Sequence, residues 1–349
     1  MKKIALWVVL VLGGLFAFPL QAQNNNELVI LTFEEMFPPE IISEFTRETG
    51  INVVFRSAVY NEEILEALEE ANGAGCDLVI GDDYIVEFAI QLGLAQKLNL
   101  GSIPNWSNIN PTFQYHFYDP NNEYTVPYGS GILTILYDPA KVNLIIRGYS
   151  DLWNPALRNR VGIIGNYRIV NGFALQTMGK SFNVEDVGEI NAAGQRLLSL
   201  APNVRIIDDT GALGEEILNG NIYAGIMYTD SVNKARVANP NLRVVYPREG
   251  IGFGIMPAFI ASGASNPAAA HRFLNFILDP KRGAACFEYL GYYCTFKASE
   301  QYITPELRQY LIMPNYRNFE FLFNIDQEAE DAHMRIWNDF RAAVERARR

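Results

Sequence analysis

The sequence predicts an α/β protein that folds into two lobes. Short runs rich in β-branched residues alternate with amphipathic helical segments from residue 28 onward, which is typical of a largely parallel sheet. A chain of 349 residues exceeds the usual size of a domain with one hydrophobic core, so we expect two domains. Two glycine-containing segments, residues 129–131 and 247–252, interrupt the pattern and are candidate hinges.

Residues 1–22 have the features of a secretory signal peptide. Lys2 and Lys3 precede an apolar run over residues 4–18, which is shorter than the roughly 20 residues of a membrane-spanning helix. Residues 20–22 form the expected cleavage site, which ends in the small residue Ala22. They contain no cysteine to which a lipid anchor could be attached. We therefore expect a mature chain that is exported to the periplasm.

The charge balance argues against a nucleic-acid partner. Without Lys2 and Lys3, 26 basic residues face 39 acidic ones, so the formal charge falls from −11 to −13. A phosphate backbone requires a basic surface, whereas an acidic protein attracts cations. The three histidines are far apart in sequence, and no motif predicts a metal or another cofactor.

The first part of the chain predicts alternating strands and helices. Pro38 and Pro39 open a helix that Gly50 ends, and Asn61 is expected to cap the next helix, which Gly73 stops. Residues 81–83 then lead from a buried strand into a third helix. The strands expected here cover residues 28–31, 51–55, 78–80, 124–128 and 132–137.

The second part predicts another α/β unit. Its expected strands cover residues 161–164, 223–227 and 242–246, and its expected helices cover residues 171–180 and 184–200. A strand over 253–261 returns to the first lobe, followed by a helix over 268–278, and the chain ends in a long helix over 326–349. We expect lobe 1 to comprise residues 27–129 with 251–303, and lobe 2 residues 130–250 with 304–349.

Two loops that follow expected strands contain acids and aromatic residues. They are residues 32–37 and 81–84, whereas a purely structural turn favours Gly, Asn and Pro. Ligands of open α/β sheets bind beyond the carboxyl ends of the strands, so these loops are candidate parts of a binding site. One of Asp82 and Asp83 is equally well explained as the N-cap of the helix that follows. The acids from Glu62 to Glu70 are interpreted as a solvated helix face.

The three cysteines leave two arrangements open. In an oxidising compartment Cys286 and Cys294 can form a disulfide, but their spacing alone does not decide whether they do. Cys76 opens an apolar run and is expected to be a buried free thiol.

Several stretches, in their order and spacing, resemble the periplasmic spermidine/putrescine-binding proteins. They are residues 44–50 (EFTRETG), 76–80 (CDLVI), 119–128 (DPNNEYTVPY), 151–153 (DLW), 246–250 (YPREG), 275–280 (NFILDP) and 290–292 (LGY). The resemblance implies a type II periplasmic-binding-protein fold, with two hinge crossovers between mixed or parallel sheets flanked by helices. It further implies a monomeric, non-enzymatic receptor that closes around a small cationic ligand, most simply a polyamine, and delivers it to an ABC permease.

The resemblance also implies ligand-binding residues. Positions that match the family's ligand contacts, or keep an aromatic where the family has one, are Phe33, Glu35, Tyr84, Tyr228, Tyr292 and Gln327. Acids at positions that are neutral in the family extend the expected site by Glu34, Asp82, Asp83 and Asp230. Carboxylates are expected to pair with ammonium groups while the rings hold the methylene chain.

The chain departs from the family where ligand identity is set. Asn166 and Ile169 stand where typical members have an Asp and a Glu, and Gly254 and Met256 stand where a Trp and an Asp are usual. The alternatives are therefore a receptor for another small solute (an amino acid, a quaternary amine or a metal complex) and a ligand-sensing binding protein. An extracellular enzyme is the weakest alternative, because no Gly-x-Ser-x-Gly, His-Glu-x-x-His or nucleotide-binding glycine motif is present.

Overall fold

A computed structural model describes residues 26–59, 61–312 and 319–349, so the expected signal peptide lies outside the described residues. The strands are β1 (Glu27–Thr32), β2 (Asn52–Ser57), β3 (Leu78–Ile80), β4 (Ala95–Gln96), β5 (Thr125–Tyr137), β6 (Val161–Ile164), β7 (Val204–Asp208), β8 (Ala224–Tyr228), β9 (Arg243–Val245), β10 (Ile251–Ala261) and β11 (Phe319–Glu320). The α-helices are α1 (Pro39–Thr49), α2 (Asn61–Glu70), α3 (Asp83–Gln91), α4 (Tyr167–Gln176), α5 (Val187–Leu198), α6 (Thr210–Leu218), α7 (Thr229–Ala238), α8 (Pro267–Ile277), α9 (Pro280–Leu290), α10 (Pro305–Leu311) and α11 (Gln327–Arg348).

One continuous path of hydrogen-bonded strands runs through the molecule in the order β2-β1-β3-β10-β5-β8-β6-β7. Strand β1 lies parallel to β2 and β3, and β6 lies parallel to β7 and β8. The strands in the middle of the path, β10 and β5, are antiparallel to their neighbours. Two parallel groups are thus joined through an antiparallel pair, which confirms the predicted mixed α/β architecture.

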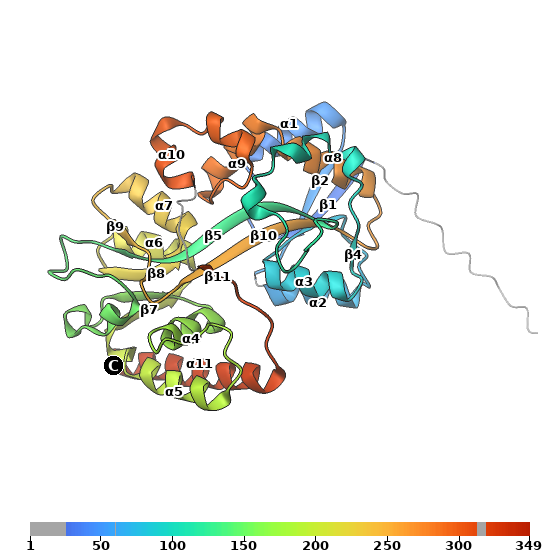
Figure 1. Ribbon diagram of the computed structural model, residues 1–349. Coiled ribbons are helices and arrows are strands. Elements are labelled where there is room, and N and C mark those ends of the chain that lie inside the picture. The colour runs from blue at the N-terminus through green and yellow to red at the C-terminus, as the bar shows by residue number, and fades with distance from the viewer. Residues whose placement is uncertain (1–25, 60, 313–318) are drawn as a thin grey trace, which may run out of the picture.

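Strands β5 and β10 form the two crossovers between the halves of the molecule (Figure 1). They pair with each other from Thr125 to Ile132, and a register shift between Met256 and Pro257 bends the ladder. Beyond Ile132, strand β5 pairs with β8 and β9 instead. The segment 129–131 was predicted to separate two strands, but the ladder passes through it, because its glycines have extended backbone conformations that pairing tolerates.

The buried apolar side chains divide into clusters on either side of this crossover. In one half, α1, α8 and α9 pack on one face of the sheet, whereas α2 and α3 pack on the other. The other half has a single cluster, to which α4, α5, α6, α7 and α11 all contribute. In Figure 1, α4, α5 and α11 lie together below the strands of this half, and α6 and α7 lie above them.

These clusters support a division into two lobes, which we propose as follows. The first lobe comprises the described residues 26–132 and 251–312, and the second comprises 133–250 and 322–349; residues 319–321 connect them, since Phe319 and Phe321 pack against a cluster of the first lobe. The expected boundary at residue 304 assigned helix α10 to the second lobe. Tyr310 and Leu311 of that helix pack in the cluster of the first lobe, so we assign α10 to the first lobe.

Cys76, Cys286 and Cys294 are all buried free thiols. Within the described residues, no helix combines the length and the apolar character that a membrane crossing requires.

The loop that leads into β5 is held by one buried carboxylate, and this generates a prediction about stability. Asp119 accepts hydrogen bonds from the backbone N–H groups of residues 123, 124 and 125 and from the Thr125 hydroxyl, at 2.9 to 3.0 Å. We expect Asp119→Ala to lower the free energy of unfolding by about 3 kcal/mol, because buried donors are left without partners. Asp138→Ala is the control, since the half-buried Asp138 side chain accepts a single hydrogen bond from the described residues, that of the Ala140 N–H. Urea unfolding measures both, and equal losses would contradict this role of Asp119.

Candidate functional site

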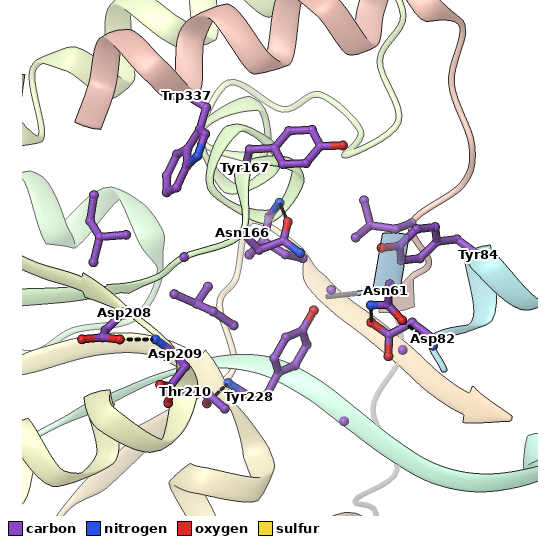
Figure 2. A pocket seen from close by; sticks show the side chains of 18 of the residues that line it. Asn61, Asp82, Tyr84, Asn166, Tyr167, Asp208, Asp209, Thr210, Tyr228 and Trp337 are labelled. Carbon is purple, nitrogen blue, oxygen red and sulfur yellow. Dashed lines mark hydrogen bonds between the residues drawn. The ribbon is translucent and has the colours of Figure 1, made fainter. Parts of the chain in front are cut away.

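A cavity of about 840 Å³ lies between the two lobes. Its walls include residues that follow the carboxyl ends of the parallel strands β1, β3 and β6, together with the carboxyl ends of β7 and β8. Figure 2 shows Asn61, Asp82 and Tyr84 on one side of the cavity and Asp208, Asp209 and Thr210 on the other. This is where an open α/β sheet binds ligands.

Asp82 is the acid whose surroundings best suit a cationic ligand. Asn61 holds its carboxylate, since the Asn61 amide donates to Asp82 Oδ2 at 2.8 Å and accepts from the Asp82 N–H at 3.0 Å (Figure 2). Asp82 stands at the N-cap position of α3 but makes no capping hydrogen bond with its side chain. Burial raises the pKa of Asp82 to about 6; the Asn61 hydrogen bond opposes this rise and nearby Glu62 adds to it.

Asp83 has a different environment from its neighbour. Its side chain is buried, and its Oδ2 accepts a hydrogen bond of 2.9 Å from the backbone N–H of Ile255 in the crossover strand β10. Burial holds the pKa of Asp83 well above its usual value, and the adjacent Asp82 adds to this effect. Asp83 therefore ties the start of α3 to the crossover, although it also lines the cavity.

The four aromatic residues expected in the site all line the cavity. Phe33 follows β1, Tyr84 lies in the first turn of α3, Tyr228 ends β8 and Tyr292 follows α9. The Tyr84 hydroxyl donates to Glu62 at 3.1 Å, and the Tyr228 N–H donates to the Thr210 hydroxyl at 3.2 Å. Tyr84 and Tyr228 thus bring rings from both lobes to one space, and the Glu62 contact holds the ring of Tyr84 (Figure 2).

Tyr292 lies against the backbone of the first crossover. A Cβ atom at Gly129 would come within 3.1 Å of its ring, so this close approach depends on glycine. The cavity thus shares a wall with strand β5.

Four expected residues are not among those that line the cavity. Glu34 and Glu35 are exposed on the loop after β1, where Glu35 adopts a left-handed conformation with φ of 56°. Gln327 is exposed at the start of α11 and donates to Asp331 at 2.9 Å. Asp230 lies in the first turn of α7, and burial raises its pKa to about 6.

All four positions that depart from the family lie in the cavity wall: Asn166, Ile169, Gly254 and Met256. Asn166 caps helix α4, because its side-chain oxygen accepts from the Ile169 N–H at 3.1 Å. A Cβ atom at Gly254 would meet nothing within 4 Å, so the space beside this glycine is open. Gly254 therefore leaves open space in the wall, and none of these four positions supplies a carboxylate.

Sequence reasoning missed several residues of the cavity. Asn61 was expected only to cap a helix and Glu62 only to face water, yet both line the wall next to Asp82. Trp337 of α11 and Tyr167 of α4 were not singled out either; Trp337 lies inside a helix, whereas the position of Tyr167 just after the expected strand 161–164 was an available signal. Asp208 ends the edge strand β7, which was not predicted, and Asp209 caps helix α6. Two adjacent acids before a helix could have identified these residues as candidates for the site.

Within the part of the chain that the structure describes, no group of three or more His, Cys, Asp or Glu side chains is arranged to hold a metal ion.

Comparisons with known proteins show to which sequences the chain is similar. Residues 74–313 match the family model described as bacterial extracellular solute-binding protein. The spermidine/putrescine-binding periplasmic protein of Salmonella typhimurium is 30% identical over 287 residues, which cover 82% of both chains. The protein of the same description from Escherichia coli is 30% identical over 291 residues, again 82% of both.

Solved structures show the same fold. A candidate spermidine/putrescine ABC transporter of Listeria monocytogenes superposes with a TM-score of 0.84 at 25% identity, covering 90% of this chain and 99% of that one. The spermidine/putrescine ABC transporter substrate-binding protein of Streptococcus pneumoniae gives a TM-score of 0.80 at 24% identity, covering 91% and 99%.

The contact between Asp83 and β10 generates a prediction. We expect Asp83→Ala to lower the free energy of unfolding by about 2 kcal/mol, because the buried Ile255 N–H loses its acceptor. Asp83→Asn keeps an acceptor oxygen and resembles the neutral carboxyl that the raised pKa favours, so it should cost clearly less. Urea unfolding at neutral pH compares the two variants, and equal losses would argue against this contact.

Proposed function

Because this chain belongs to the bacterial extracellular solute-binding proteins, we propose that it captures a linear polyamine between its lobes and delivers it to an ABC importer. The relatives described as spermidine/putrescine-binding support this ligand class. The observation that carries the proposal is the Asp82 carboxylate, which Asn61 holds at the cavity wall among the rings of Tyr84, Tyr228 and Tyr292.

This arrangement suits an ammonium group physically. The raised pKa of Asp82 indicates that its carboxylate has lost part of its hydration. A positively charged partner would stabilise the carboxylate in place of the lost water. Aromatic faces attract cations and pack against methylene groups, so the same wall accommodates both parts of a polyamine. Contacts from both lobes would favour the closed arrangement, which is how ligand binding drives hinge closure.

The proposal includes the setting in which the protein acts. The relatives are periplasmic, and we propose that this chain is likewise exported to the periplasm by its signal peptide and serves as a monomer. Its partner would be the permease of the importer. We propose that it binds its ligand without transforming it, since neither the sequence motifs nor the cavity suggests a nucleophile with an adjacent base.

One observation favours a second candidate ligand, a small amino acid. Arg341 and Arg348 of helix α11 also line the cavity and could meet a carboxylate. 4-Aminobutanoate carries one ammonium and one carboxylate, so titration with it separates this alternative from a polyamine. Tighter binding of 4-aminobutanoate than of putrescine would favour the amino-acid receptor.

Removing the charge of Asp82 tests the proposed function. We expect the purified mature protein, freed of ligand by unfolding and refolding, to bind putrescine or spermidine in isothermal titration. Asp82→Asn should weaken this binding more than tenfold, or about 1.4 kcal/mol, because the ammonium loses its charged partner. Glu35→Gln removes the same charge from an exposed position outside the cavity and is the control. Absence of binding by the folded wild-type protein would refute the proposal.

The raised pKa of Asp82 predicts a pH dependence of affinity. With a pKa of about 6 in the free protein, most Asp82 is charged at pH 7 but only about a tenth at pH 5, whereas alkyl ammonium groups remain protonated at both. A cation binds the charged form, so affinity must fall as the pH falls. We expect about tenfold weaker putrescine binding at pH 5 than at pH 7 in the wild-type protein, and a flatter profile in Asp82→Asn. Parallel profiles would show that Asp82 does not meet the ammonium.

A further inference from the structure

The two walls of the cavity differ in their chemistry. The wall from the first lobe carries Glu62, Asp82 and Asp83 and no basic residue. Around the start of α4, the wall from the second lobe is largely apolar and is formed by Ile164, Ile169, Ile207 and Trp337, with Asn166 among them. Apart from the hydroxyl groups of Tyr167, Thr210 and Tyr228, the wall around Asn166 therefore offers apolar surface and one amide group.

The acids that the second lobe and β11 bring to the cavity are poorly placed to bind an ammonium group. Asp208 and Asp209 are exposed, and each accepts a backbone N–H, from Asp209 and Ala212 respectively. Glu320 accepts from the side chains of Gln176 and Ser181 and from the Phe182 N–H. Glu345 is exposed on α11, the helix that also brings Arg341 and Arg348 to the cavity. A solvated or already paired carboxylate is a weak anchor for an ammonium group.

The orientation of the Asn166 amide is fixed by its own helix. Because the Ile169 N–H is a donor, the group 3.1 Å from it must be the side-chain oxygen and not the nitrogen. The nitrogen donates no hydrogen bond to another described residue, and Figure 2 shows it on the side of the amide that faces the cavity. Asn166 thus presents its N–H donors toward the cavity, while its oxygen, which keeps one of its two acceptor sites, lies on the other side of the amide and accepts from the Ile169 N–H.

This matters because an ammonium group has donors and no acceptor. An ammonium at Asn166 would meet another donor in apolar surroundings and would leave its charge unpaired, which is costly. A carbonyl oxygen at the same place would accept from Asn166, and the carbon atoms beside it would pack against the isoleucines. The wall is complementary to an uncharged end that carries an acceptor.

We propose that Asn166 is a specificity-determining residue that selects ligands with one ammonium group and one amide carbonyl, such as a mono-N-acylated diamine. The ammonium meets Asp82, the methylene chain crosses the aromatic rings, and the carbonyl accepts from Asn166. This inference rests on the proposed function, since it concerns the far end of the ligand in the same cavity.

Isothermal titration with three probes tests the inference: putrescine, N-acetylputrescine and n-butylamine. The wild-type protein should bind N-acetylputrescine at least tenfold more tightly than either of the other two. Asn166→Asp keeps an oxygen for the Ile169 N–H, and Asp caps helices as well as Asn, so the fold should be retained. Its new carboxylate accepts from an ammonium group, so its preference should shift at least tenfold toward putrescine.

Asn154→Asp is the matched control. Asn154 also caps a helical turn in the second lobe, through a side-chain oxygen that accepts from the Ala156 N–H at 2.9 Å, and it lies outside the cavity wall. This variant adds the same charge and should keep the wild-type preference. Circular dichroism and thermal melting verify that both variants fold.

The outcomes separate the two proposals. If the wild-type protein binds putrescine or n-butylamine as tightly as N-acetylputrescine, or if Asn166→Asp keeps the wild-type preference, the role of Asn166 is refuted and the polyamine receptor stands. A shift of the same size in Asn154→Asp also refutes it, because a general charge effect then explains the change. If the folded wild-type protein binds none of the three amines but binds spermidine, the role of Asn166 is refuted and the polyamine receptor stands. If it binds neither the three amines nor spermidine, the proposed function fails and this inference fails with it.

Discussion

The desolvation of one carboxylate organises the candidate site. Asp82 is kept at the cavity wall by a reciprocal pair of hydrogen bonds with Asn61, so that the start of α2 and the start of α3 act as one unit. A desolvated charge without a counter-charge is unfavourable, and the pKa of Asp82 is accordingly raised by burial. The neighbouring Asp83 meets the same constraint differently, through a backbone donor of the crossover. Two adjacent acids thus have separate tasks, one toward the cavity and one toward the fold.

Much of the fold could be predicted because the local signals are strong. Gly50 ends α1 in the left-handed conformation that glycine adopts readily, and the apolar periodicity of α3 buries Ile85 and Ala89 as expected. We propose a different boundary from the expected one at residue 304, because α10 is short and its Tyr310 and Leu311 pack in the core of the first lobe. The edge strand β7 was missed because Arg205 interrupts its apolar run.

The candidate site was predictable only in part. Rules about strand ends pointed to the loops that contain Phe33, Asp82 and Tyr84, and the family resemblance added Tyr228; all four line the cavity. They do not tell which way a side chain leaves a loop, and Glu34 and Glu35 turn outward beside a residue with positive φ. Residues such as Asn61 and Trp337 come from a helix start and a helix interior, and only the packing of helices around the sheet brings them to the ligand space.

The continuous pairing of β5 with β10 affects how the lobes can move. Strands β5 and β10 remain hydrogen-bonded to each other at Gly129 and Gly131. Such a paired ribbon bends and twists along its length and does not rotate about a single residue. Opening would then be distributed as small changes in twist over many residues, and little chain would pass from order to disorder. Opening and closing of the lobes would then change the conformational entropy of the chain only slightly. A small ligand with few contacts would therefore suffice to shift the equilibrium toward the closed state.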